Sequence, residues 1–476
     1  MRRSILTFAA ALLLSSCTVG PDYQAPDLNA PSNFVSQDVL SLLNDGKQDA
    51  AVKIDWWTGF EDEILNALVA AGLEHNFEIA AAVARVKEAQ ARVGLADAGD
   101  ALSIDAGADA DVSERQELNG DTEQTTTRSM SGSLGFGLPL DIFGQTRRDV
   151  EAANAALESE NAALKSVVLD VSTDVASEYL TLRGNQRQLE LLRESVALQE
   201  KTMSIVNSRY KAGLAPELDL RRAETSVENL RASIPPLEED LKNSRNRLAT
   251  LTGKFPGEYE QMLSAQKASP VYKSAIPELI PMQVLKMRPD VRQAEADLKE
   301  AVANIGVAEA DYYPALRLTG NISIGTTIVS SVSPTEVLVA TIGGLIDQVL
   351  TDGGARAANL DITKARAEAA LATYEQTLRT ASEEVERSLA AIESSLKRQT
   401  SLEKSVSSSQ RSFAQAETLY QQGLISFLDV VDAQRVLASA EQNLASERTN
   451  YATQIAALFR VLAIGIDDIS YADAEQ

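Results

Sequence analysis

The chain has 476 residues, an aromatic content of only 5% and a formal net charge of −24. A surface this acidic argues against nucleic acid as a partner, and few aromatics with abundant Ala, Leu, Glu and Ser favour long helices over compact cores. The sequence contains one histidine, His75, and one cysteine, Cys17. A histidine-based metal cluster, a catalytic triad and an internal disulfide bond are therefore excluded, and we expect neither an enzyme nor a bound cofactor.

The first residues have the pattern of an export signal. Arg2 and Arg3 precede the apolar run 5–14, which is too short to span a membrane as a helix, so residues 1–16 are predicted to be a signal peptide. The run leads into Leu14-Ser15-Ser16-Cys17, which resembles a bacterial lipobox, and we expect a covalent lipid on Cys17. The alternative is an ordinary signal peptide with a chance cysteine. Thr18 stands where such lipoproteins carry Asp for inner-membrane retention, which favours the outer membrane. One acyl chain anchors weakly, so a second anchoring device is expected.

Residues 17–60 contain several prolines and are predicted to form an extended arm, and a helical pattern follows from about 61 to 98. Between 101 and 141 the period changes to two on either side of a polar turn, which predicts a β-hairpin. Its apolar positions are Leu102, Ile104, Ala106, Ala108, Ala110 and Val112, then Met130, Gly132, Leu134, Phe136, Leu138 and Leu140. Each run is about 11 residues long, the length of a membrane-spanning strand. An amphipathic hairpin on a soluble core is the alternative.

Residues 143–253 predict a long helical hairpin. Residues at seven-position intervals in its first arm are Val168, Val175, Leu182, Leu189, Val196, Met203 and Tyr210. Such a repeat is typical of helices supercoiled on a neighbour, and the arm would be about 100 Å long. Pro235 and Pro236 are expected to break the returning arm.

The second half of the chain repeats the first. After a connecting segment, 254–289, the run Glu300–Gly306 copies Glu88–Gly94, and the heptad series returns at an offset of 210 residues, from Leu378 to Tyr420. The predicted layout is a first structural repeat at 61–253 and a second at 290–465, with a β-hairpin at 315–350, a helical hairpin at 353–465 and a tail at 466–476. The fourth strand alternates poorly and is placed by the repeat alone.

Both helical hairpins bend at matching sequences, Tyr210–Thr225 and Tyr420–Arg435. Four strands cannot close a membrane barrel, which needs eight or more, and an open sheet edge is not tolerated in lipid. The chain is therefore expected to oligomerise, with each copy giving four strands to one barrel. The expected fold class is mainly α with a membrane β-barrel part, and a hollow assembly of this kind is a conduit.

Several motifs carry a resemblance to a known family. They are Cys17 to Tyr23, Asp55-Trp56-Trp57, Arg288 to Arg292, Tyr313-Pro314, Leu428-Asp429 and Asp432 to Arg435. With them, essentially the whole mature chain resembles the outer-membrane efflux lipoproteins of the TolC-like superfamily, in the OprM/NodT-like branch. The resemblance implies a homotrimer with a twelve-stranded β-barrel and a periplasmic tunnel of twelve helices. It also implies a periplasmic adaptor protein and a proton-driven inner-membrane transporter of the RND type as partners.

The resemblance places a periplasmic gate at the bends, formed by Leu428, Asp429, Asp432 and Arg435. Copies of an acidic residue around an axis would form a ring that attracts cations. The alternatives are local. Ser426 can cap the following helix with Asp429 three residues on, and Asp432 with Arg435 can form a surface pair.

The same resemblance implies a lock between the hairpins, a hydrogen bond from Tyr420 to Asp219. Ile425 stands where a relative can carry an arginine for a second lock, and Arg222, opposite the position of Asp432, is expected to form a different ion pair in its place. The turns Gly213-Leu214 and Gly423-Leu424 are the expected adaptor-docking sites; otherwise these glycines only satisfy a tight bend.

Three functions remain open at this stage. The first is a passive, gated exit duct of a tripartite efflux pump that conducts small molecules or drugs. The second is the same duct in a type I protein-secretion system, with an ABC transporter as the pump. The third is a structural periplasmic coiled-coil lipoprotein with no pore, against which the alternating strands argue.

Overall fold

The structure is a computed structural model of the whole chain. It describes residues 18–26, 35–36, 38–39, 44, 55–116, 124–265, 267–276, 281–330 and 333–464. The predicted signal peptide, Cys17 and the tail 466–476 lie outside these residues. The chain forms two compact units. One contains residues 1–27, 85–161 and 293–375, and the other contains 28–84, 162–292 and 376–476.

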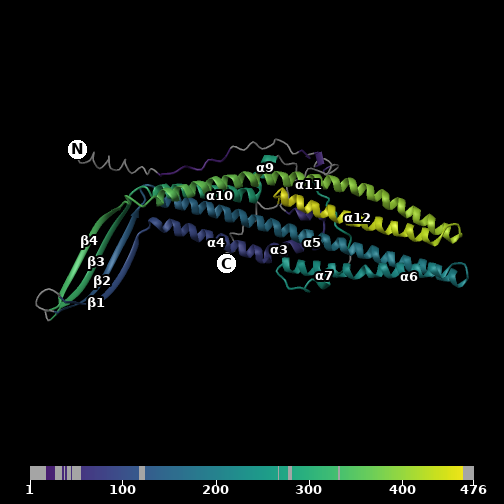
Figure 1. The fold of residues 1–476 in the computed structure, drawn as a ribbon, viewed down its shortest axis with the longest axis horizontal. Coiled ribbons are helices and arrows are strands. Elements are labelled where there is room, and N and C mark those ends of the chain that lie inside the picture. Colours follow the sequence, from purple (N-terminus) through teal and green to yellow (C-terminus); the bar gives the residue numbers. More distant parts are fainter. Residues whose placement is uncertain are drawn as a thin grey trace. The chain divides into compact units, whose positions relative to one another are not determined.

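The first unit contains one antiparallel sheet in the order β1-β2-β3-β4 (Figure 1). Its strands are β1 (Ser103–Gln116), β2 (Gln124–Leu140), β3 (Ala315–Val329) and β4 (Thr335–Asp347). The hairpins occupy the segments in which the sequence predicts them, including β4, which only the repeat had placed. Within the described chain β1 pairs only with β2 and β4 only with β3, so both outer edges of the sheet are free.

The cross-strand register gives the sheet two different faces. Ile104 lies opposite Phe136, and Leu134 lies opposite Ile322, which itself lies opposite Ala340, so one face is apolar. The residues between them form the other face, which carries Asp105, Asp109, Asp111, Ser129, Ser131, Ser133, Thr319 and Asn321. The predicted alternation is therefore realised across the first three strands, and β4 has apolar residues on both faces.

Helices begin or end close to each strand of the sheet. They are α4 (Phe77–Asp97), followed by the short η2 (Ala98–Asp100), then α5 (Gln145–Lys211), α10 (Pro289–Ala310) and α11 (Ala355–Gln421). Gly144 makes the turn from β2 into α5 with φ +81°, a conformation that favours glycine. The ring of Phe143 stacks on that of Tyr313, two residues before the start of β3, with centroids 4.7 Å apart.

The sequence predicts one helix over 61–98, and this prediction is wrong. Two helices are present, α3 (Glu63–His75) and α4, and they are separated at Asn76. The buried Asn76 side chain accepts hydrogen bonds from the backbone N–H groups of Glu78 and Ile79, at 2.7 and 3.2 Å. Its amide donates to the Leu251 carbonyl at 2.8 Å. Asn76 thus caps the second helix, which a search for apolar periodicity cannot detect.

The second unit contains most of the two helical hairpins, from residues 162 and 376 onward, and their bends lie at the same end (Figure 1). The first hairpin runs through α5, α6 (Glu217–Ala232) and α7 (Ile234–Leu251), and the second through α11 and α12 (Phe427–Val461). Short elements of this unit are η1 (Trp56–Phe60), α8 (Glu260–Ser264) and α9 (Pro281–Met287). α6 ends at Ala232 and α7 begins at Ile234, with Pro235 and Pro236 in its first turn, so the predicted break in the returning arm is confirmed.

The seven-residue series marks the buried face of the long helices. Val175, Leu182, Val385 and Ile392 are fully buried. Away from the bends, burial therefore follows the predicted register. At the bends it becomes unequal, because Tyr210 is 39% exposed and its repeat partner Tyr420 only 6%.

Two of the sequence motifs have structural roles in this unit. Trp56 is buried and stacks on Phe459 with ring centroids 5.1 Å apart. Arg288 is also buried; it donates to the carboxylates of Asp290 and Glu384 at 2.7 and 2.6 Å and to the Val461 carbonyl at 3.0 Å. A buried, fully paired arginine of this kind holds helices in place, because losing one partner would leave a charge unpaired in the core.

Candidate gate at the two helical bends

The first bend ends α5 with a glycine in the left-handed conformation. Gly213 has φ +71°, its N–H donates to the Tyr210 carbonyl at 2.9 Å, and the Leu214 N–H donates to the Arg209 carbonyl at 2.8 Å. These two bonds form a Schellman motif, which satisfies the last carbonyls of a helix. A Cβ at Gly213 would meet nothing within 4 Å. Glycine is therefore favoured here by the backbone conformation and not by a close neighbour.

The second bend repeats this geometry at the end of α11. Gly423 has φ +76°, its N–H donates to the Tyr420 carbonyl at 3.0 Å, and the Leu424 N–H donates to the Leu419 carbonyl at 3.0 Å. The repeat found in the sequence is therefore also a repeat of hydrogen bonds.

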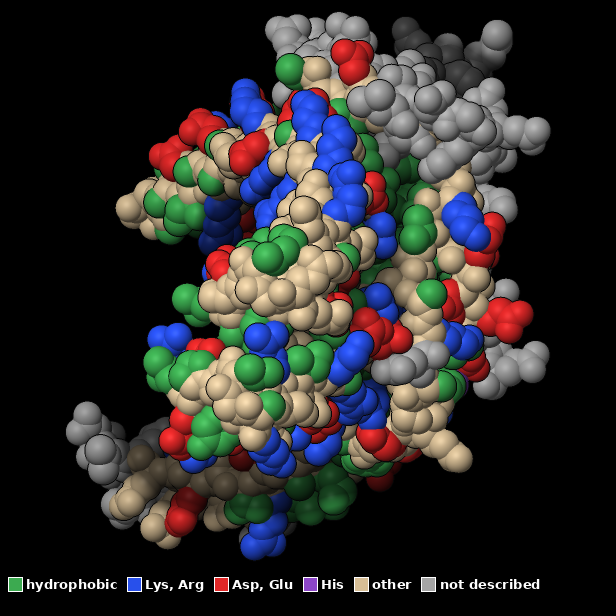
Figure 2. Space-filling view, turned by 90° about the vertical axis from the view of Figure 1, so that its right-hand side faces the viewer, with side chains coloured by type: hydrophobic (Ala, Val, Ile, Leu, Met, Phe, Trp, Pro, Cys, Tyr) green, Lys and Arg blue, Asp and Glu red, His purple; other side chains and the backbone are tan. Residues whose placement is uncertain are grey.

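Leucine side chains are exposed at equivalent positions of the two bends. Leu214 and Leu424 are 70% and 67% exposed, and Leu218 and Leu428 are 57% and 58% exposed. A leucine that follows a Schellman glycine often packs back on its own helix, but here both project outward. Figure 2 views this end of the molecule and shows hydrophobic side chains at the surface among charged ones. Each bend thus presents a small apolar surface.

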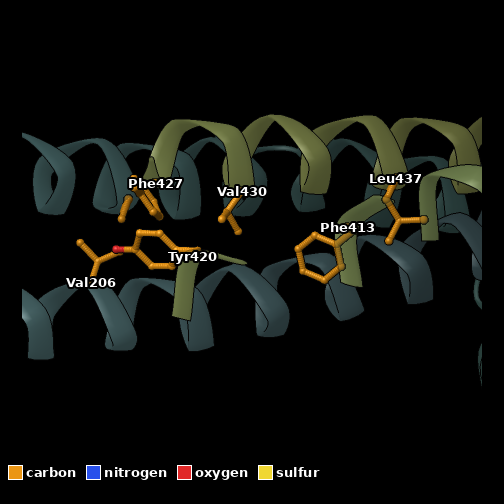
Figure 3. Close-up of a cluster of buried hydrophobic side chains, with 7 residues drawn as sticks. Val206, Phe413, Tyr420, Phe427, Val430 and Leu437 are labelled. Atoms are coloured by element: carbon orange, nitrogen blue, oxygen red, sulfur yellow. The ribbon is translucent and has the colours of Figure 1, made fainter. Parts of the chain in front are cut away.

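Just behind the bends, the two hairpins pack on one another through what we call the tip cluster. Its members are Val206, Ala223, Phe413, Tyr420, Phe427, Val430 and Leu437 (Figure 3). They come from α5, α6, α11 and α12, and all are buried. Ile425 packs against this cluster. The contact between the hairpins is therefore mainly apolar.

Arg209 adds a polar contact that the sequence did not indicate. Its guanidinium lies over the Tyr420 ring, 4.8 Å from the centroid, and Nη1 donates to the Tyr420 carbonyl at 3.1 Å. The repeat gives no cue to this role, because the position equivalent to Arg209 is Leu419.

Tyr420 is where the predicted lock is centred. Burial raises the pKa of its phenol, the nearby Arg209 charge lowers it, and the Asp219 carboxylate raises it. Asp219 is thus close enough to act on Tyr420 electrostatically. Across the residues that the structure describes, however, no hydrogen bond joins Asp219 to Tyr420. The lock predicted between these two residues remains a prediction.

Asp429 is part of the start of α12. Both the N–H and the hydroxyl of Ser426 donate to its carboxylate, at 2.9 and 2.7 Å. These bonds stabilise the ionised form and lower the pKa of Asp429. The side chain is exposed, so this local role leaves one side of the carboxylate open to solvent.

Asp432 and Arg435 form an ion pair at 2.7 Å with side chains 62% and 74% exposed. A pair this exposed contributes little to stability. Arg222 is exposed on α6, and in the part of the chain that is described it makes no ion pair with Asp432. Among the described residues no group of three or more His, Cys, Asp or Glu side chains could hold a metal ion.

A sheet with one apolar face and two free edges, together with paired helical hairpins joined behind their bends, defines a subunit of an outer-membrane channel. The chain belongs to the outer membrane efflux protein family, whose model matches residues 68–254 and 280–463. It is an outer-membrane protein of the TolC-like superfamily.

Several relatives match over most of the chain. Nodulation protein T of Rhizobium leguminosarum bv. viciae is 33% identical over 436 residues, covering 91% of this chain and 88% of its own. The cation efflux system protein CusC of Escherichia coli O6:H1 is 30% identical over 462 residues, covering 97% and 98%. The outer-membrane channel OprN has a similar structure, with a TM-score of 0.86, 29% identity and coverage of 94% and 99%.

Proposed function

We propose that three copies of this chain form the exit duct of a tripartite efflux pump and conduct small molecules or ions passively out of the cell. The sheet carries this proposal. Its four strands have one lipid-compatible face and two unpaired edges, and such edges must be closed in a membrane. Pairing of β4 with β1 of the next copy would give a closed twelve-stranded barrel without changing the antiparallel order.

In this barrel the polar face of each sheet lines the lumen. Asp105, Asp109 and Asp111 alternate with the apolar residues of β1, so three copies would bring nine carboxylates to the pore wall. Carboxylates on a pore wall favour cations over anions. Each of the two proposed structural repeats, 61–253 and 290–465, supplies two strands to this sheet.

The bends form the proposed gate. The tip cluster and the contact of Arg209 with Tyr420 hold the two hairpins of one copy together, and we assign the constriction to the exposed Leu428, Asp429, Asp432 and Arg435. Asp429 performs the helix-start role and the gate role together, because both hydrogen bonds from Ser426 end on its Oδ2 atom and the side chain is exposed. Asp219, Tyr420 and Arg222 form the proposed lock.

The exposed leucines at the bends support a periplasmic adaptor as the direct partner. A periplasmic adaptor protein would dock on the apolar turns at Gly213-Leu214 and Gly423-Leu424, because burying their leucines is favourable. A proton-driven inner-membrane transporter would supply the energy. Two relatives carry names that fit this role, a cation efflux system protein and an antibiotic efflux pump outer membrane protein. A lipid on Cys17 would add to the anchorage of the barrel.

Single-channel recording of the purified protein in a planar bilayer tests the proposal. Wild-type protein is expected to give a small, cation-selective conductance. In the double variant Asp429→Ala/Asp432→Ala the conductance should rise or lose cation preference. If the double variant has the same conductance and ion selectivity as wild type, the two aspartates are not part of the gate. A well-folded, inserted protein with no conductance in either form would refute the duct.

A further inference from the structure

The start of the described chain is held by a buried arginine. Arg148, on α5, is 3% exposed. It donates to the carbonyls of Val19 and Gly20 at 3.0 and 3.1 Å, and to the carboxylates of Asp22 and Glu151 at 2.8 and 2.6 Å. The arm thus supplies two carbonyls and one carboxylate to a guanidinium that has little access to water. Removing the arm would leave this charge short of partners, which is costly in a buried position.

Two glycines allow the arm to lie this close. Gly20 has φ +92°, and a Cβ on it would come within 2.4 Å of the Gly306 Cα on α10. A Cβ on Gly306 would come within 2.8 Å of Arg148 Cγ. Backbone therefore lies directly against backbone, and the arginine fills the remaining space. Either glycine would be hard to replace, since the atoms that it would meet belong to backbone or to a buried side chain.

Further bonds fix the arm on either side of this contact. The Val19 N–H donates to the Phe143 carbonyl at 3.1 Å, and Arg147 donates to the Thr18 hydroxyl at 2.9 Å. Beyond Gly20, the Tyr23 hydroxyl donates to Glu295 at 3.1 Å, and burial together with this carboxylate raises the pKa of Tyr23. Residues 18–23 are therefore bound along their length by α5, α10 and Phe143, which lies between β2 and α5.

The repeat provides a matched site without an arm. Gly94 in α4 is the sequence equivalent of Gly306 in α10, yet a Cβ on Gly94 would meet nothing within 4 Å. The residue equivalent to Arg148 is Ala357. The glycine is thus common to both repeats, whereas the buried arginine and the bound arm occur at one of them.

We propose that Arg148, Gly20 and Gly306 form a dock that fixes the first residues of the mature chain at the junction of sheet and helices, and so sets where the lipid enters the membrane. The dock rests on the proposed function for the lipid on Cys17. Thr18, which follows Cys17, lies against Gly144, and Gly144 follows Phe143 of the Phe143–Tyr313 stack. Aromatic residues of this kind mark the edge of the membrane-facing band.

Docking changes what one lipid can do. A single acyl chain binds a membrane weakly and reversibly, and on a free arm it would place no constraint on the sheet. On a docked arm the acyl chain on Cys17 would enter the bilayer one residue before Thr18, which lies against Gly144. Anchoring and sheet insertion then act as linked binding events with a high effective concentration. Arg148 is therefore a positioning residue: it holds the arm, and with it the lipid anchor, next to the sheet during assembly.

A photo-crosslinking experiment tests the dock in the full-length protein. Tyr23 is replaced by p-azidophenylalanine, and the protein is irradiated in outer membranes and analysed by peptide mass spectrometry. We expect residues 18–26 to crosslink to the α10 segment around Glu295. The yield should fall at least fivefold in Gly20→Ala and in Arg148→Met, and detergent-resistant trimers should fall with it. Arg148→Lys should retain part of the yield.

The matched control is Gly94→Ala, which should leave both the crosslink and the trimers unchanged. Absence of the crosslink in the otherwise unaltered protein, or the same yield in Gly20→Ala and Arg148→Met, would overturn the dock. Because the yield is read on membrane-inserted protein only, a folding failure of one variant does not decide the result. The mass of the N-terminal peptide reports the lipid separately, so an intact crosslink on an unacylated Cys17 would refute the anchor while leaving the dock itself in place.

Discussion

Arg209 joins the two hairpins through both its charge and its N–H groups. The guanidinium contacts the Tyr420 ring and the Tyr420 carbonyl, so it bonds one residue in two ways. A cation–π contact and a hydrogen bond from a charged donor each contribute on the order of 1–2 kcal/mol when partly buried. The contact is thus large enough to influence the equilibrium between a closed and an open bend.

We therefore predict that Arg209→Met raises the open probability of the channel in planar bilayers roughly tenfold, as expected for a loss of about 1.4 kcal/mol. The control is Arg221→Met, which removes ion pairs to Glu217 and Glu224 that lie within α6 and are exposed. An equal effect of both substitutions would show that charge at the bend, and not this contact, controls opening.

Asp429 gives a prediction for pH. Its pKa lies below the ordinary value because Ser426 donates two hydrogen bonds to the carboxylate. A lowered pKa means that the stabilisation is fully present above about pH 4 and is lost as the pH falls through the folded-state pKa. In Ser426→Ala the folded-state pKa should move back up, so the folded carboxylate should become protonated at a higher pH and the loss should be smaller and complete at a higher pH.

Acid titration of the conductance, from the side that the bends face, measures this shift. The midpoint should be higher in Ser426→Ala than in wild type, and Asp429→Asn should lack this component. Identical midpoints for wild type and Ser426→Ala would mean that the capping bonds do not govern the ionisation that the channel senses.

At the scale of elements, much of the fold could be predicted from periodicity. A period of two placed three strands, a period of seven marked the buried face of α5 and α11, and the repeat placed β4. The break at Asn76 could not be predicted in this way, because it depends on a side-chain bond to the distant Leu251 carbonyl. The Arg209 contact was missed for the same reason, since it exists only once the two hairpins pack together.

The two Schellman bends provide a prediction for glycine. Since a Cβ at Gly213 or Gly423 meets no atom, substitution costs only the left-handed backbone conformation, about 1–2 kcal/mol for Ala. Asn tolerates this conformation better. Gly213→Ala and Gly423→Ala should therefore be nicked faster by protease at the bends than Gly213→Asn and Gly423→Asn. Equal rates for Ala and Asn would contradict the backbone explanation.

At the scale of the whole molecule, what one chain leaves exposed indicates what other copies must cover. The apolar face of the sheet includes Ile104, Leu134, Ile322 and Ile342, each more than half exposed. Both sheet edges are free, and Tyr210 is exposed where Tyr420 is buried. The sequence predicts oligomerisation from the strand count alone, and the structure adds that the sheet has one apolar and one polar face, which the proposed barrel would turn to lipid and to the lumen.

The central claim is that β1 of one copy pairs with β4 of the next. Disulfide crosslinking tests it most directly, because Cys17 is the only native cysteine. Ala108→Cys in β1 would be combined in turn with Leu338→Cys, Ala340→Cys and Ile342→Cys in β4, and oxidised in the outer membrane. At least one pair should give a covalent species of three chains, which reduction returns to monomers. Each single substitution should give none. Monomers from every pair, in protein that is folded and inserted, would contradict a barrel shared by three chains.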